Sequence, residues 1–229
     1  MRVALIIPAL NEEATIEATL DEVPPGLYEQ VLVVDNGSSD CTSQVALSHG
    51  ASVLSEPRRG YGNACLCGLA ALPKGIDVVV FMDADGSDAP IEAERLLAPI
   101  VAGHSDFVLG SRTLGDAETG SLNAHQRAGN VIATLLIRLF WRYHYTDLGP
   151  FRALRLSSLR ELKMSDSNYG WTIEMQINAI RAGLRIAEVP VSYRCRRAGR
   201  SKVSGSVFGS FAAGVKILWT VVRLGLTRW

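Results

Sequence analysis

The chain has 229 residues, of which 48% are hydrophobic and 20% are charged, and its formal net charge at pH 7 is zero. This length suits one large domain or two small ones, and the composition excludes a disordered or collagen-like chain. The zero charge hides an asymmetry, because residues 1–118 carry six Lys and Arg against 18 Asp and Glu, whereas residues 119–229 carry 17 against five. An acidic half of charge −12 is therefore joined to a basic half of charge +12.

In the acidic half, apolar segments of strand length alternate with helical patterns, as in βαβ units with a mostly parallel sheet. The expected strands are 3–8, 31–35, 51–55, 78–83 and 107–110, and the expected helices are 12–22, 41–49, 61–72 and 91–102. The strands are short and bounded by Gly, Pro, Asp or Asn. We therefore predict an α/β fold, a Rossmann-like doubly wound sheet with helices on both faces.

The basic half has a different pattern. It contains a polar loop at 111–121, an amphipathic stretch at 127–145, a strand at 149–156, a helix at 171–182, a strand at 185–193 and a basic loop at 194–204. The last segment, 205–226, sorts into two faces at helical spacing. One face is apolar and holds Val207, Phe211, Val215, Leu218, Trp219, Val222 and Leu226. The other holds Ser206, Gly209, Ala213, Lys216, Thr220, Arg223 and Thr227.

The same segment bears on where the protein works. Trp on the apolar side and only basic charges on the polar side suit a membrane interface, and packing on the core is the alternative. No uncharged apolar run reaches the ~18 residues of a spanning helix. The chain enters a strand pattern at residue 3 without a signal peptide, and its four cysteines form no cluster with His. We expect a cytoplasmic protein that binds the cytoplasmic face of the membrane peripherally.

Carboxylates follow three predicted strands at the point where each strand ends. Glu12 follows the first strand, Asp35 ends the second, and Asp83 and Asp85 end the fourth. Ligands of open parallel sheets bind beyond the carboxyl ends of the strands. Two carboxylates spaced by one residue can bind Mg²⁺ or Mn²⁺ and the substrate phosphates that it holds, although an isolated Asp is also common in solvated turns.

Several nucleotide and hydrolase motifs are absent from the sequence. No G-x-G-x-x-G follows the first strand, and neither G-x-x-x-x-G-K-[ST] nor G-x-S-x-G occurs. These absences weigh against a dinucleotide dehydrogenase, a P-loop NTPase and an α/β-hydrolase. The pattern favours a nucleotide whose diphosphate is held by a metal ion.

A series of segments then identifies a family. In chain order they are IPALNE, VDNGSSD, RRGYGNA, DADGS, GSR, RAGN, TDLGPFRA, WTIEM, EVPVSYR and GRSK. Together they resemble the family 2 glycosyltransferases of GT-A fold, most closely the branch of dolichyl-phosphate mannose synthase and the bacterial polyprenyl-phosphate glycosyltransferases. The resemblance covers residues 3–226.

The resemblance implies a donor site and a domain plan. It implies that Pro8, Ala9, Glu12 and Asp35 line the base and ribose, with Arg59 and Gly60 of RRGYG, and that Asp83 and Asp85 hold the metal and diphosphate. The mannose synthases have DADLQHP where this chain has DADGSDAP, so Ser87 stands at the position of a metal-binding Gln. We expect 1–118 to bind metal and nucleotide sugar, 119–204 to bind the acceptor, and 205–229 to form the amphipathic helix.

The resemblance also gives the basic residues a role. It places Arg112, Arg127, Arg196 and Lys202 around the phosphates of donor and acceptor, and Arg suits bidentate phosphate contacts. The charges crowded into 196–202 would repel one another without an anion. Glu174 and Glu188 are candidate general bases or buried carboxylates satisfied by other groups. The second is favoured, because a phosphomonoester with a second pKa of ~6 needs no base.

These observations predict an inverting transferase that moves a hexose from a UDP- or GDP-sugar to a polyprenyl or dolichyl phosphate. Asp85, Arg112 and Arg127 are the expected catalytic residues, and Mg²⁺ or Mn²⁺ is the expected cofactor, held by Asp83, Asp85 and Ser87. The alternatives are a non-catalytic nucleotide-sugar-binding protein and a transferase with a soluble sugar acceptor. No nucleic acid is expected as a partner, whereas a membrane-protein partner or a homo-oligomer stays open.

Overall fold

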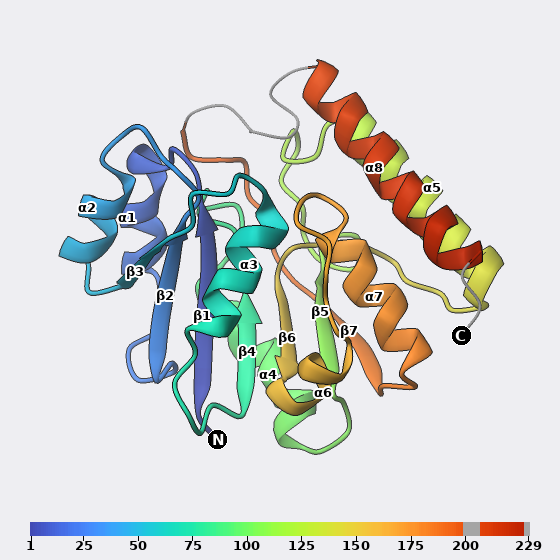
Figure 1. Cartoon of the computed structure of the whole chain (residues 1–229), viewed down its shortest axis with the longest axis horizontal. Helices are drawn as coiled ribbons and strands as arrows, with labels where there is room; N and C mark the ends of the chain where they lie inside the picture. Colours follow the sequence, from blue (N-terminus) through green and yellow to red (C-terminus); the bar gives the residue numbers. More distant parts are fainter. Residues whose placement is uncertain (199–206, 227–229) are drawn as a thin grey trace.

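A seven-stranded sheet crosses the molecule in the order β3-β2-β1-β4-β6-β5-β7 (Figure 1). The computed structural model describes residues 1–198 and 207–226. The strands are β1 (Val3–Ala9), β2 (Gln30–Asp35), β3 (Ser52–Ser55), β4 (Val78–Phe81), β5 (Phe107–Ser111), β6 (Arg152–Arg155) and β7 (Ile186–Pro190). Six pairings define the sheet, and β6 alone runs antiparallel to its neighbours β4 and β5. The prediction of a mostly parallel sheet is confirmed.

Helices cover both faces of this sheet. They are α1 (Glu13–Asp21), α2 (Thr42–Ser48), α3 (Tyr61–Ala70), α4 (Ala93–Val101) after the 3₁₀ turn η1 (Pro90–Glu92), α5 (Ala124–Trp141), α6 (Leu156–Glu161), α7 (Trp171–Arg181) and α8 (Val207–Leu226). One apolar core packs α1, α2 and α4 against the sheet, and the other packs α3, α6 and α7. Central strands are therefore buried on both sides, as the fully buried Val-Val-Val-Phe of β4 shows.

The direction of β6 has a consequence for the site. Arg152 at the start of β6 pairs with Phe81 at the end of β4. The loop that precedes β6 therefore reaches the edge of the sheet where the parallel strands end. The expected strand at 149–156 is shorter in the structure, and its last residue begins α6, which was not predicted.

The last described helix, α8, packs on α5 and α7 along the outer side of the molecule (Figure 1). The predicted polar face of α8 is turned toward the protein, and part of its predicted apolar face is exposed. Lys216 forms an ion pair with Asp166 at 2.9 Å and Thr220 is buried, whereas Val215, Trp219 and Leu226 are 49%, 61% and 73% exposed. On α5, Val131, Ile132, Leu135, Leu139 and Phe140 are also exposed. We call these eight side chains the outer apolar face.

No helix in the described parts of the chain combines the length and hydropathy needed to cross a bilayer. The predicted residues Lys202, Ser206 and Thr227, and the loop 199–204, lie outside the described residues.

Candidate donor and acceptor sites

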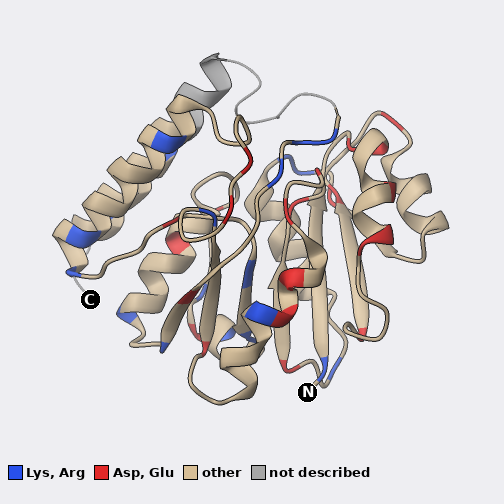
Figure 2. Ribbon diagram, turned by 180° about the vertical axis from the view of Figure 1, so that it is seen from behind, with Lys and Arg blue, Asp and Glu red and all other residues tan. Residues whose placement is uncertain are grey.

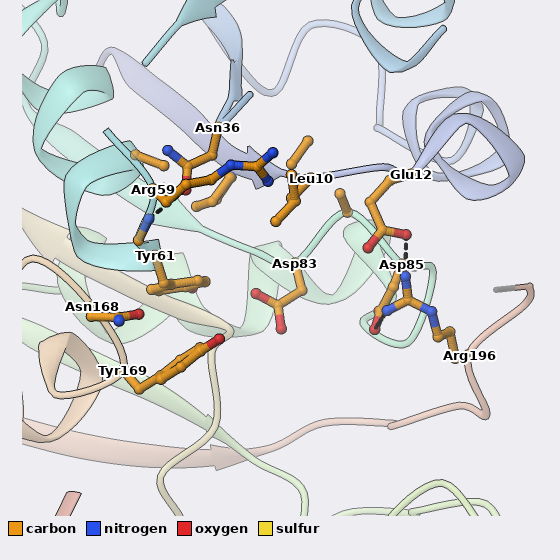
Figure 3. A pocket seen from close by; sticks show the side chains of 15 residues that line it. Leu10, Glu12, Asn36, Arg59, Tyr61, Asp83, Asp85, Asn168, Tyr169 and Arg196 are labelled. Carbon is orange, nitrogen blue, oxygen red and sulfur yellow. Dashed lines mark hydrogen bonds and ion pairs between the residues drawn. The ribbon is translucent and has the colours of Figure 1, made fainter. Parts of the chain in front are cut away.

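A pocket of about 250 Å³ opens at the carboxyl ends of β1, β2 and β4 (Figure 3). Its lining residues are Pro8, Ala9, Leu10, Glu12, Asn36, Arg59, Gly60, Tyr61, Ala64, Asp83, Ala84, Asp85, Asn168, Tyr169 and Arg196. Eight predicted site residues meet here, namely Pro8, Ala9, Glu12, Arg59, Gly60, Asp83, Asp85 and Arg196. They come from loops that follow three parallel strands and from the basic segment before residue 199.

Acidic groups and one guanidinium line one end of the pocket. Arg196 donates through Nη1 to Asp85 at 2.9 Å and through Nη2 to Glu12. Glu12 also accepts a 3.0 Å hydrogen bond from the hydroxyl of Thr15, which orients its carboxylate. Figure 3 shows Arg196 between these carboxylates, with Asp83 facing the pocket.

Asp83 lies deeper, and its surroundings penalise its charge. Burial and the neighbouring Asp85 carboxylate raise the pKa of Asp83 to about 7, although the Tyr61 hydroxyl donates a hydrogen bond to it. Asp88, which we did not predict as a site residue, accepts the backbone N–H of Asp83 at 3.2 Å. Its Oδ1 is buried and has no partner among the described residues, and burial with the Asp83 charge raises its pKa as well.

These oxygens fit a hard divalent cation, which takes carboxylate ligands together with phosphate oxygens and water. The carboxylates of Glu12, Asp83 and Asp85 do not close into a cage, and the only tight ligand group in the described parts of the chain is exposed, at Glu17, Asp21 and His49. A divalent ion in such an open set would need further oxygen ligands, for example from a phosphate or from water. Asp83, Asp85 and Glu12 are the groups that would hold such an ion.

The opposite end of the pocket is built by close backbone packing. Asn36 donates to the carbonyls of Glu56 and Arg58 and accepts the N–H of Gly60 at 2.7 Å, which fixes the RRGYG loop. A Cβ on Gly60 or Gly62 would lie about 2 Å from the carbonyl oxygens of Ser167 and Asp166. Only glycine allows this approach, which brings the segment carrying Asn168 and Tyr169 into the pocket wall.

Asp166 and Glu174 hold that segment in place. Glu174 accepts both N–H groups of Ser165 and Asp166, at 3.0 and 2.8 Å, and the Ser165 hydroxyl. Asp166 accepts the N–H groups of Asn168 and Gly170 at 2.9 and 3.1 Å and the ammonium of Lys216. Glu174 is thus committed to positioning this turn, as the favoured alternative in the sequence analysis expected.

Two predicted donor-site residues lie outside the pocket wall. Asp35 accepts hydrogen bonds from the Ser38 N–H at 2.7 Å and from the Ser43 hydroxyl. Burial raises the pKa of Asp35, but these hydrogen bonds outweigh it and leave the pKa below its usual value. Ser87 is 2% exposed and is not among the lining residues, and its N–H donates to Asp85 at 3.0 Å.

Arg112, which the sequence analysis assigns to a phosphate, is held in place by Asp147. Its N–H, Nε and Nη2 donate to Asp147 at 2.8, 2.7 and 2.8 Å, and its guanidinium lies 4.9 Å from the centre of the Tyr193 ring. Glu188 accepts the N–H groups of Thr146 and Asp147. Although burial raises the pKa of Glu188, its oxygens are occupied by these donors, so it acts as a support rather than a free base.

Arg127, Arg194 and Arg197 do not line the pocket. Arg127 lies exposed in the first turn of α5, where its backbone N–H donates to the carbonyl of Asn123 at 3.0 Å. The basic residues before position 199 lie beside the acidic loops at the edge of the sheet (Figure 2). Arg194 and Arg197 both pair with Glu22.

Comparison with known proteins agrees with this geometry. The model of Glycosyl transferase family 2 matches residues 4–163. An uncharacterized glycosyltransferase of Mycobacterium tuberculosis is 38% identical over 96% of this chain and 97% of its own. The undecaprenyl-phosphate mannosyltransferase of Micrococcus luteus is 33% identical over 100% of this chain and 96% of its own.

A solved structure is similar over the whole chain. Glucosyl-3-phosphoglycerate synthase of Mycobacterium tuberculosis, crystallised with Mn²⁺, uridine diphosphate and glucosyl-3-phosphoglycerate, superimposes with a TM-score of 0.81 and 26% identity. The match covers 100% of this chain and 81% of that one. The predicted GT-A fold is confirmed.

Proposed function

The chain belongs to glycosyl transferase family 2 and is a glycosyltransferase, and from this premise we propose that it moves a hexose to a polyprenyl phosphate. The donor is a UDP- or GDP-sugar, the anomeric carbon is inverted, and Mg²⁺ or Mn²⁺ is required. Membership of this family sets aside the alternative of a non-catalytic nucleotide-sugar-binding protein.

One observation carries the proposal, namely that acidic side chains at one end of the pocket lie next to arginine side chains. Glu12, Asp83 and Asp85 lie near the guanidinium of Arg196. Arg112, which directly follows β5, is close enough to Asp88 for its charge to oppose the rise that burial causes in the pKa of Asp88. A metal-bound diphosphate carries both signs of charge and matches this arrangement. The base end, walled by Arg59, Tyr61 and Tyr169, suits the planar ring of a nucleotide.

The residues divide the chemistry between positioning and charge. A metal ion bound by Asp83 and Asp85 would stabilise the negative charge that develops on the departing diphosphate. Arg112, fixed by Asp147, orients the acceptor phosphate toward the anomeric carbon, and Arg127 and Lys202 are proposed to bind the same phosphate. The acceptor dianion attacks without a general base, and Glu174 and Glu188 are occupied by backbone donors.

The lipid nature of the acceptor is supported by the outer apolar face. Neither α5 nor α8 contains an acidic residue, and both carry Arg or Lys. Exposed apolar side chains on two helices whose only charged residues are basic fit an anionic bilayer surface. The Micrococcus luteus relative is named for an undecaprenyl-phosphate acceptor. We therefore place the protein peripherally on the cytoplasmic face of the membrane.

A soluble acceptor is the second candidate. The mycobacterial synthase of similar structure was crystallised with glucosyl-3-phosphoglycerate, and its match covers this whole chain. Both acceptors present a phosphate, so Arg112 could serve either. The outer apolar face, which a soluble substrate does not need, favours the lipid.

The deciding experiment offers the full-length protein UDP-glucose, UDP-N-acetylglucosamine and GDP-mannose in parallel. Each donor is tested with a short polyprenyl phosphate or with 3-phosphoglycerate, in Mn²⁺, in Mg²⁺ and in EDTA. We expect a lipid-linked hexose with one donor class, lost in EDTA. Transfer to 3-phosphoglycerate but not to the lipid would establish the second candidate.

A further inference from the structure

Arg196 forms ion pairs with two pocket carboxylates, Glu12 and Asp85. Its side chain is 17% exposed, and those of Glu12 and Asp85 are 8% and 15% exposed. Its Nε donates to the carbonyl of Ala198 at 2.8 Å, so each of the three guanidinium nitrogens has an acceptor. The contact joins residues far apart in sequence, since Arg196 follows β7 whereas Glu12 follows β1.

The neighbours of Arg196 are anchored independently of it. The N–H groups of Arg194 and Arg197 donate to the carbonyls of Ser87 and Asp85 at 2.8 and 3.4 Å. The side chains of Arg194 and Arg197 bind Glu22 rather than the pocket carboxylates. The Arg196 side chain can therefore leave the pocket while residues on either side of it stay attached.

The charge of the pocket explains why a cation sits there. Glu12, Asp83, Asp85 and Asp88 gather at one edge of the sheet, and without a counter-charge they would repel one another. Both oxygens of Asp85 already have partners, because Oδ2 accepts from Arg196 at 2.9 Å and Oδ1 accepts the N–H of Ser87 at 3.0 Å. A divalent ion on Asp85 would therefore compete with the guanidinium for this carboxylate and be repelled by its charge.

On the basis of the metal-dependent function proposed above, we propose that Glu12 and Asp85 form a cation site that Arg196 fills in the free protein. The metal ion that enters with the donor replaces the guanidinium, and Arg196 then turns to the donor phosphates. Arg196 thus opposes binding of the metal alone and favours binding of the metal together with a diphosphate. It acts as a selectivity residue for the complete donor complex.

The test is a titration of Mn²⁺ into the full-length protein in the absence of substrate. The electron paramagnetic resonance signal of free aqueous Mn²⁺ reports how much of the ion is bound. Because R196A removes a competing cation, it should bind Mn²⁺ alone roughly fivefold more tightly than the wild type. R194A is the matched control from the same segment, and its Mn²⁺ affinity should stay within about twofold of the wild type.

A second arm adds UDP or GDP. In the wild type the diphosphate should strengthen Mn²⁺ binding, and in R196A this strengthening should shrink, since the two ligands lose a shared partner. Equal or weaker binding of Mn²⁺ alone by R196A would overturn the exchange.

The variant D85N separates this outcome from failure of the proposed function. If D85N loses Mn²⁺ binding while R196A matches the wild type, the metal site stands and only the exchange is wrong. If D85N binds Mn²⁺ as the wild type does, both the metal site and the exchange fail.

Discussion

The proposed donor side and the proposed acceptor side of this protein are constructed in different ways. On the donor side, Glu12, Asp83 and Asp85 stand directly after parallel strands, so the regular α/β pattern alone places them at one edge. On the acceptor side, Arg112 depends on Asp147, which is 35 residues away in the chain, and on Glu188 behind it. The first side is positioned by topology and the second by a chain of hydrogen bonds.

The largest effect is expected from a substitution on the donor side. Asp85→Asn removes a charge from the metal and diphosphate site and should lower turnover about 1000-fold, since metal stabilisation of the leaving group is worth several kcal/mol. Asp77→Asn is the control, an exposed Asp at the other end of β4. Steady-state rates and circular dichroism give the readout, and near-normal turnover of D85N would remove the metal from the mechanism.

Next comes the acceptor side, where the support of Arg112 can be broken. Asp147→Asn should lower kcat/KM for the lipid acceptor about 100-fold, the size of effect that a misplaced catalytic group produces, and leave donor binding unchanged. Asp106→Asn breaks a similar pair with Arg185, at 2.7 and 2.9 Å, at the opposite edge of the sheet and should have no such effect. If D147N also lost about 100-fold in donor affinity, Asp147 would support both binding sites rather than the acceptor site alone.

A smaller effect is expected at the outer apolar face. Leu139→Glu and Trp219→Glu should each weaken association with anionic vesicles by about tenfold, since each removes an apolar side chain from the bilayer interface. Leu47→Glu on α2 is matched in exposure, at 58% against 61% for Trp219, and should bind like the wild type. Flotation at low and high salt measures this, and association that ignores both salt and these substitutions would contradict the membrane assignment.

The smallest effect concerns stability and pH. The pKa of Asp83 rises from 3.8 to about 7 on folding, so the folded state holds a proton that the unfolded state has lost between these values. The stability of the metal-free protein therefore falls as pH rises toward 7, where the buried charge forms. Asp83→Asn should raise the melting temperature by several degrees at pH 8 and little at pH 4. A lower melting temperature at pH 8 would show that Asp83 is not strained.

The same contrast explains what the sequence could predict. All seven strands and the pocket carboxylates were predictable, because short β-branched runs and the residues that end them are local signals. The reversed direction of β6 and the short helix α6 were not, since strand direction leaves no periodicity and six residues are too few for a helical pattern. Asn168 and Tyr169 carry no motif, and only their packing against Gly60 and Gly62 brings them to the pocket.

The roles of single residues were also harder to predict where they depend on contacts made only in the folded chain. Asp147 was visible within TDLGPFRA, but its function depends on its contact with Arg112. Ser87 was assigned by its position in a motif, but in the structure it is buried and does not line the pocket. Asp35 was also assigned by its motif, and in the structure it accepts the N–H of Ser38 in its own loop.

The ion pair between Lys216 and Asp166 connects helix α8 to the pocket at the carboxyl ends of β1, β2 and β4. Asp166 has only 1% of its side chain exposed and shapes the turn that presents Asn168 and Tyr169. Cutting the chain before α8 would leave this buried carboxylate without its cation, a costly change at a distance from any lipid. We therefore expect truncation to weaken the proposed nucleotide binding as well as the proposed membrane binding, since the helix supports the turn that lines the pocket.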